Sequence, residues 1–487
     1  MSARSARPLS ESTPAAQGVD ARGVGAFVDA LEAAPGIEPH SLMIVRHGHV
    51  AASGWWAPYS PDRPHLLYSI SKSFTSTAAG FAVAEGLMSL DDTVLSHFPE
   101  FDGDITDPRS RAMLVRHVAS MASGHLAETR EQAFSRDPDE PVRGFLLTPP
   151  DRDPGTVFAY NQPATYSLAA IVQRVTGQSL IDYLRPRLFD PLGIAETAWI
   201  QRPPGRDLGF SGMFATTDAL ARLGLLYLGN GVWEGRQLLP ASWVAEATRA
   251  HITNADGTAE GALSDWQQGY GFQFWRSRHG YRGDGAYGQF CLVLPEYDAV
   301  IAMTADTVEM QAVLDLVWRH LLPAFGPAPL DGREDEDAAL RRRLDGLQLP
   351  PSYEKFSSEA SSVAGATTFT PAGGTCADQP TLAEVTVAAD GDGAWTLSLA
   401  EGVSRLDVRL TPEWTVEEGT DGRVPTAASG GWTDPDTFVA DIAFLETPHH
   451  LDVTCSRADR TFTARWRTTP LHSALLPAMG VPRRARG

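Results

Sequence analysis

The residues best suited to chemistry are Ser69 and Lys72, which lie three positions apart in the segment Ser69-Ile-Ser-Lys72 ahead of an apolar stretch. If this stretch forms a helix, the spacing puts both side chains one turn apart on the same face. A lysine amine can accept the serine proton only if burial keeps it neutral, because the ordinary pKa of lysine is about 10.4. The pair therefore predicts a serine nucleophile with a lysine general base.

The spacing alone does not identify the site, because the sequence repeats it. Lysine occurs only at positions 72 and 355, and Ser352-Tyr-Glu-Lys355 has the same Ser-x-x-Lys spacing. Ser352 follows two prolines and precedes a polar stretch, where nothing would desolvate a lysine. The context favours Ser69 and Lys72 as the site and predicts a solvated surface for Ser352 and Lys355.

Two later segments add candidates. Tyr160-Asn161-Gln162 follows a Pro-Gly turn at a predicted loop-to-helix junction, where a tyrosine can relay protons if a nearby cation lowers its pKa. On its own, this segment favours a core tyrosine beside a helix cap. Gly283-Asp284-Gly285-Ala286 precedes a predicted strand, and its small residues would let backbone N–H groups approach a substrate as an oxyanion hole does. A glycine-rich hairpin turn explains the second segment equally well.

Taken in order, the three segments resemble the signature of the class C β-lactamase and penicillin-binding-protein-like serine hydrolases: Ser-x-x-Lys, then Tyr-x-Asn, then Lys/His-x-Gly. Other segments resemble the family in the same order: Val115-Arg-His-Val-Ala-Ser-Met-Ala-Ser-Gly124, Leu188-Phe-Asp-Pro-Leu-Gly-Ile194 and Ser211-Gly-Met-Phe-Ala-Thr-Thr-Asp218. The resemblance extends over residues 21–325. It implies an antiparallel sheet flanked by helices, with a mostly helical subdomain and the site between them.

The resemblance also implies roles for single residues. Ser69 would be the acylated nucleophile, and Lys72 and Tyr160 would share the base and acid roles. The backbone N–H groups of Ser69 and Ala286 would form the oxyanion hole. The family's substrate-contacting positions fall here on Asn161, Gln162, Gly283, Asp284 and Gly285. No cofactor and no metal is implied.

Two departures from the family pattern narrow the expected chemistry. Gln162 stands where the Tyr-x-Asn motif usually has its final asparagine. The usual Lys/His position of the last motif falls on Gly283, so no cation holds a substrate carboxylate unless Arg282 swings in. This favours an esterase, or an amidase for neutral substrates, and disfavours a β-lactamase or a D-amino-acid peptidase. A non-catalytic binding protein that retains the fold is the remaining alternative.

The elements that must position these residues follow from the hydrophobic pattern. We expect a strand and tight turn over 41–50, a helix from Phe74 to about Glu85, mainly helices over 90–250, strands over 270–305, and a helix over 310–322. This order predicts an α+β fold. Residues 1–20 read as a flexible lead-in and 326–350 as a linker with a short helix. Residues 351–487 alternate as short strands and predict a separate all-β, barrel-like domain that resembles the lipocalin-like appendages of this superfamily.

Composition restricts the partners. The formal net charge of −20 argues against nucleic acid or an anionic membrane surface, which leaves a small-molecule ester or amide. The three cysteines, Cys291, Cys376 and Cys455, offer neither a disulfide framework nor a zinc site. The N-terminus has no apolar secretory core, so we expect a cytoplasmic protein. His449 and His450 stand in a polar turn, where we expect exposure rather than metal binding, and the oligomeric state stays open.

Overall fold

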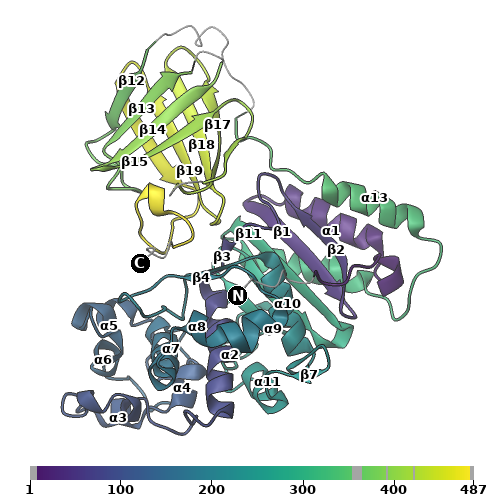
Figure 1. The fold of residues 1–487 in the computed structure, drawn as a ribbon, viewed down its shortest axis with the longest axis vertical. Coiled ribbons are helices and arrows are strands. Elements are labelled where there is room, and N and C mark those ends of the chain that lie inside the picture. Colours follow the sequence, from purple (N-terminus) through teal and green to yellow (C-terminus); the bar gives the residue numbers. More distant parts are fainter. Residues whose placement is uncertain (1–7, 354–364, 391–392, 420–422, 483–487) are drawn as a thin grey trace.

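The chain folds around two sheets, a central sheet covered by helices and a C-terminal barrel-like sheet (Figure 1). The computed structural model describes residues 8–353, 365–390, 393–419 and 423–482. Lys355 of the second Ser-x-x-Lys segment lies outside these ranges, whereas Ser352 is exposed. The predicted α+β fold with an additional all-β unit is confirmed.

The central sheet is antiparallel and has the strand order β2-β1-β11-β10-β9-β8. Side chains alternate across a strand, and on β11 they alternate between two cores: Val300 and Ala302 enter one core, Ile301 and Met303 the other. A strand buried on both faces reads as a nearly continuous apolar run, so both faces need helices. The strands are β1 (Ile37–Arg46), β2 (His49–Trp55), β8 (Trp275–Arg276), β9 (Tyr281–Gly285), β10 (Gln289–Leu294) and β11 (Ala299–Thr307).

Helices cover each face of this sheet. One core is closed by α1 (Ala21–Ala33), α12 (Met310–Leu316) and α13 (Glu334–Asp345). The other is closed by α2 (Ser71–Ala84) and α10 (Thr217–Leu228). Helix α2 begins three residues before the expected Phe74, so Lys72 lies in its first turn.

A helical region, whose α7 packs against α2, forms the other side of the catalytic unit (Figure 1). Its helices are α3 (Pro108–Ala112), α4 (Val115–Ala119), α5 (Arg130–Arg136), α6 (Pro141–Leu146), α7 (Gln162–Thr176), α8 (Leu180–Leu184), α9 (Asp190–Leu192) and α11 (Ala241–Thr248). Two small sheets complete the unit: β3 (His65–Leu66) with β5 (Met213–Ala215) and β4 (Ala198–Trp199), and β6 (Val232–Trp233) with β7 (Arg236–Gln237).

The C-terminal sheet has nine strands in the order β15-β14-β13-β12-β20-β19-β18-β17-β16. A parallel bridge between Thr411 and Ser429 brings its two ends together, so the barrel is nearly closed. Its strands are β12 (Thr367–Pro371), β13 (Glu384–Ala389), β14 (Trp395–Glu401), β15 (Ser404–Leu410), β16 (Thr415–Glu417), β17 (Thr426–Trp432), β18 (Thr437–Phe444), β19 (His450–Ser456) and β20 (Thr461–Trp466).

Several local expectations are wrong. From residue 8 the predicted loose lead-in packs on the sheet: the Ser12 N–H donates to the Val50 carbonyl at 3.0 Å and Val19 is buried. His449 and His450 are fully buried rather than exposed, because the barrel docks this turn against the catalytic unit.

The three cysteines are free and buried.

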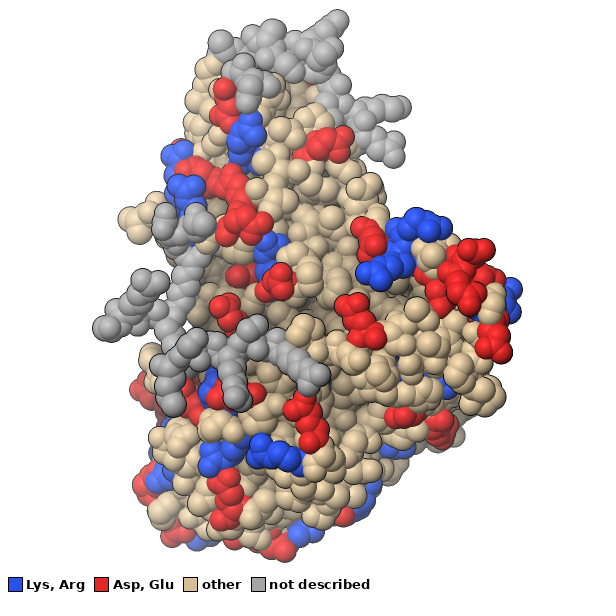
Figure 2. Space-filling view, turned by 45° about the vertical axis from the view of Figure 1, so that its right-hand side comes forward, with Lys and Arg blue, Asp and Glu red and all other residues tan. Residues whose placement is uncertain are grey.

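The surface mixes charges of both signs. In the face shown in Figure 2, Lys and Arg side chains are interspersed with Asp and Glu. Among the described helices, none combines the length and the apolar character that crossing a bilayer requires.

Candidate active site

Ser69 lies in a single 3-10 turn, η2 (Tyr68–Ile70), that leads directly into α2. The residue before it, Tyr68, has φ +47° and is almost fully buried. A bulky residue in the left-handed region is a strained outlier that costs about 1–3 kcal/mol, and it persists only where the surroundings hold it. The strained residue presents Ser69, which stays partly accessible, at the helix start.

The Lys72 amine contacts three oxygen atoms. Its Nζ lies 3.0 Å from Ser69 Oγ and donates to Gln162 Oε1 at 2.6 Å and to the Phe210 carbonyl at 2.7 Å. The amide and carbonyl oxygens only accept, so a neutral amine gives them its two N–H groups. Its lone pair then faces Ser69, which is the geometry that a general base requires.

The burial of Lys72 favours its neutral amine form. Burial lowers its pKa to about 7, although Glu128 and Asp284 oppose this by raising it. The Glu128 carboxylate accepts the Arg130 and Gln162 N–H groups at 2.9 and 3.1 Å, and burial raises its own pKa. Sequence reasoning missed Glu128, since no local motif marks it.

Tyr160 lies beside this pair. The Lys72 Nζ is 4.8 Å from the centre of its ring, which stacks on Trp275 at 5.2 Å. Burial raises the Tyr160 pKa, and a hydrogen bond with Ser69 opposes the rise. The condition that a nearby cation lowers this pKa is therefore not met, because Arg282 opposes the rise without reversing it. The hydroxyl stays protonated, suited to donating a proton rather than to accepting one at the start.

The two amides after Tyr160 have different surroundings. Asn161 is fully buried, and its Oδ1 accepts from the Thr129 N–H and hydroxyl, both at 3.0 Å. Gln162 contacts Lys72 directly. Asn161 therefore fixes the loop at Thr129, whereas Gln162 orients the lysine, although the family pattern predicts substrate contacts for both.

The strand β9 forms the opposite wall. A Cβ on Gly285 would come within 2.2 Å of the Leu67 carbonyl, and one on Gly283 within 3.0 Å of Ser73 Oγ. Position 285 therefore needs glycine for β9 to lie against the backbone before η2, whereas at position 283 a larger residue would make a tight contact with α2. Ala286 follows in the turn after β9, and the Gln289 Nε2 donates to its carbonyl at 3.1 Å.

Arg282 does not swing into the site. Its Nε contacts Asp284 Oδ2 at 2.8 Å, and its Nη1 donates to Ser277 Oγ at 2.6 Å and to the Asp265 carbonyl at 2.8 Å. Burial raises the Asp284 pKa, which the guanidinium opposes. Residues 282 and 284 share a face of the strand, so strand alternation could have predicted this pair.

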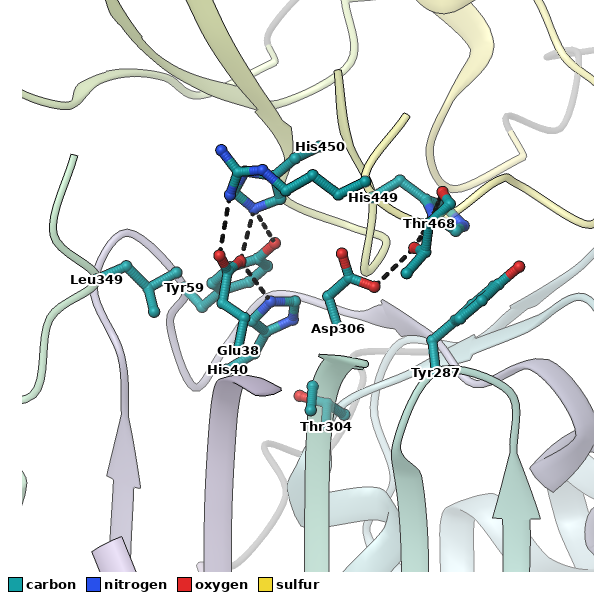
Figure 3. A network of polar contacts seen from close by, with 12 residues as sticks. Glu38, His40, Tyr59, Tyr287, Thr304, Asp306, Leu349, His449, His450 and Thr468 are labelled. Atoms are coloured by element: carbon teal, nitrogen blue, oxygen red, sulfur yellow. Dashed lines mark hydrogen bonds and ion pairs between the residues drawn. The ribbon is translucent and has the colours of Figure 1, made fainter. Parts of the chain in front are cut away.

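One group among the described residues has the ligand types for a metal: Glu38, His40 and His450, whose ligand atoms lie within 4.8 Å of one another. Figure 3 shows His450 of the barrel facing Glu38 and His40 at the end of β1. His450 contacts Glu38 at 2.9 Å and Asp441 at 2.8 Å, and Arg467 contacts Glu38 at 3.0 Å. Protein cations already neutralise these carboxylates, so the group is a complete ion-pair network across the domain interface.

The fold and these motifs define a serine hydrolase. Residues 24–322 match the family model described as Beta-lactamase, so the chain belongs to that family. The match spans both walls of the site, from α1 to the end of the central sheet and its closing helix.

Particular relatives refine this class. The chain is 30% identical to the 6-aminohexanoate-dimer hydrolase of Paenarthrobacter ureafaciens over 54% of this chain and 71% of the relative. It is 29% identical to the lovastatin esterase of Penicillium rubens over 30% of this chain and 42% of that enzyme. The solved structure of SurE matches 91% of this chain and 100% of its own with a TM-score of 0.51 at 18% identity, so the likeness in fold includes the barrel.

Proposed function

We propose that the protein hydrolyses small ester substrates through an acyl-Ser69 intermediate, with Lys72 as the base and Tyr160 as the proton relay. The observation that carries the proposal is the contact between the buried Lys72 amine and Ser69 Oγ at 3.0 Å, with only uncharged oxygens as its other hydrogen-bond partners. These surroundings support a base that works near neutral pH.

In acylation, neutral Lys72 takes the Ser69 proton while Oγ bonds to the substrate carbonyl carbon. The negative charge that develops on the carbonyl oxygen is assigned to the backbone N–H groups of Ser69 and Ala286. The bond to the leaving alkoxide then breaks, and the alkoxide receives the Tyr160 proton, which Lys72 replaces. In deacylation a water molecule gives a proton to neutral Lys72 while the water oxygen attacks the acyl carbon. The bond between the acyl carbon and Ser69 Oγ then breaks, and Oγ takes the proton back from Lys72.

The β9 wall supports substrates without a carboxylate at this position. Arg282 is committed to Asp284, Ser277 and a carbonyl, and position 283 has no side chain. A buried acid at position 284 would repel a substrate anion whenever it is ionised. Esters fit this wall. The relative named 6-aminohexanoate-dimer hydrolase cleaves an amide bond, which supports an amide as the second candidate, with any substrate carboxylate lying away from this wall.

The test pairs a fluorophosphonate probe with three substrate types: p-nitrophenyl esters, 6-aminohexanoate dimer and a chromogenic cephalosporin. We expect ester turnover and a single labelled residue, Ser69, located by mass spectrometry. Ser69→Ala should abolish both, and Lys72→Met should lower kcat by about 10²–10⁴-fold, the usual contribution of a positioned base.

Lys355→Met is the matched control, because it removes the lysine of the other Ser-x-x-Lys segment and should leave kcat unchanged. Turnover of the cephalosporin in preference to esters would replace the esterase proposal with a β-lactamase. If neither the probe nor any substrate reacts at Ser69, the chain is a binding protein on this fold.

A further inference from the structure

The C-terminal barrel reaches the residue beside the nucleophile. The Tyr68 hydroxyl hydrogen-bonds to His449 Nε2, which belongs to the turn between β18 and β19. Tyr68 is the residue with φ +47° immediately before Ser69, and it is 1% exposed. A side chain of one domain therefore holds the strained backbone that presents the nucleophile of the other.

The direction of this hydrogen bond follows from the neighbours of the imidazole. His449 Nδ1 lies 2.9 Å from the Thr468 carbonyl, which can only accept, so Nδ1 carries the proton. Nε2 therefore has the lone pair, and the Tyr68 hydroxyl donates to it. The Thr468 hydroxyl in turn donates to Asp306 Oδ1 at 2.6 Å at the end of β11 (Figure 3). This bond fixes Thr468, whose carbonyl accepts from His449 Nδ1.

Two more contacts from the segment after β20 reach both sides of the cleft. His472 Nε2 lies 2.7 Å from Ser211 Oγ, next to the Phe210 carbonyl that accepts from Lys72, and its ring stacks on Tyr68. On the β9 side, Tyr287 is the residue after Ala286, and its hydroxyl donates to the Thr469 carbonyl at 2.5 Å. The barrel thus contacts the neighbours of the nucleophile, of the base and of the proposed oxyanion hole.

We propose that His449 is a positioning residue for catalysis: it fixes Tyr68 in the left-handed conformation that aims Ser69 Oγ at Lys72, so the site is complete only with the barrel docked. This inference rests on the proposed function of Ser69. Loss of the contact frees the Tyr68 backbone to relax toward an ordinary conformation. Ser69 then turns away from the lysine lone pair, and an error of about 1 Å in such a geometry costs up to about 10²-fold in rate.

The test uses the full chain and the ester that the wild type turns over. Tyr68→Phe removes the donor, together with a weak acceptor for the Leu471 N–H at 3.4 Å. His449→Leu removes the acceptor, together with the Nδ1 contact to Thr468. Each should lower kcat about 10–100-fold with KM changed less than about 2-fold, and should slow fluorophosphonate labelling of Ser69 in parallel. His449→Gln supplies another acceptor and should restore most of kcat, which a purely structural role would not predict.

Arg63→Gln is the matched control, because it breaks another ion pair between the two domains, Arg63 with Glu418 at 2.7 Å, away from Ser69. It should leave kcat unchanged, with Tm measured for every variant. Unchanged kcat in Tyr68→Phe and His449→Leu, or an equal loss in Arg63→Gln, overturns the inference. A wild type that neither labels nor turns over any substrate contradicts the proposed function instead.

Discussion

Two buried basic side chains, Lys72 in the cleft and His450 at the domain interface, are driven to opposite protonation states. Burial opposes the charged form of both. The Lys72 pKa nevertheless falls to about 7, whereas the His450 pKa rises to about 10. The difference lies in the partners: besides Ser69, Lys72 bonds to an amide and a carbonyl oxygen, but His450 bonds to two carboxylates.

Partner charge thus decides what burial does. Carboxylates at hydrogen-bond distance outweigh the desolvation of a cation, and uncharged oxygens do not. Asp306, in the same interface, repeats the rule with the opposite sign. It accepts a hydrogen bond from a threonine hydroxyl, and burial raises its pKa to about 7. His450 and its two carboxylate partners therefore stay charged, whereas Asp306 and Lys72, which lack a hydrogen-bonded partner of opposite charge, are shifted toward their neutral forms.

The largest effect is expected from removing one charge of the interface network. In Asp441→Asn, His450 and Arg467 lose the buried carboxylate that both contact, and Glu38 is left as the partner that they share. Breaking a buried ion pair in this way costs about 3–5 kcal/mol. Denaturant unfolding should show that loss in the free energy of unfolding.

An exposed ion pair provides the control for this result. Arg249→Gln removes the exposed pair with Glu246 and should change the free energy of unfolding by less than about 1 kcal/mol. Equal losses in the two variants would contradict the view that burial makes the interface network matter.

A second variant should give Lys72 a carboxylate partner, as His450 has. Gln162→Glu places a carboxylate where Oε1 now lies 2.6 Å from the Lys72 Nζ. An opposite charge at this distance should raise the lysine pKa by about 1–3 units. At pH 7, kcat should fall about 5-fold to 500-fold and recover at higher pH, as steady-state rates across pH 6–10 would show.

Gln162→Met separates the charge from the lost hydrogen bond, because it removes the acceptor without adding a carboxylate. Its kcat profile should keep its midpoint near pH 7 or move lower. A rise in the midpoint in Gln162→Met equal to that in Gln162→Glu would mean that the new charge is not the cause.

The sequence predicts one member of this comparison and not the other. The proposed nucleophile and base stand in one helical turn, so spacing and the apolar helix suffice to place Ser69 beside Lys72. The interface histidines face residues about 400 positions away in the chain, such as Glu38, and no local pattern encodes such a contact. The same holds for Tyr68: nothing in its neighbours marks a left-handed backbone, since the conformation is imposed by the fold around it.

The β9 wall lies between these extremes. Glycines at 283 and 285 are visible in the sequence, and the structure shows that Gly285 avoids a clash with the backbone before η2 and Gly283 a tight contact with α2. The pairing of Arg282 with Asp284 follows from strand alternation once the strand is recognised. What local reasoning misses is that this pairing removes the arginine from substrate binding.

The smallest effect is a pH dependence to which the cleft and the interface contribute separately. With the Lys72 pKa at about 7, kcat/KM should fall as the pH drops from 8 to 6, because the base becomes protonated. Asp306 has a folded pKa of about 7, above its unfolded value, so its contribution to stability is present at low pH and lost as the pH rises to 7. Burial lowers the pKa of His40, His449 and His472, so these side chains destabilise the folded state on acidification. Asp306 opposes this trend and should make the fall in Tm below pH 7 shallower.

Asp306→Asn tests whether the two contributions are independent. The amide cannot titrate, so Tm should fall more steeply on acidification than in the wild type, whereas the decline in kcat/KM below pH 7 should stay unchanged, since it belongs to Lys72. The measurement is Tm by calorimetry and kcat/KM on the same ester, both between pH 6 and 8. If the kcat/KM profile shifts together with the Tm profile, the cleft and the interface titrate as one unit, and the proposed separation between the Lys72 site and the interface is wrong.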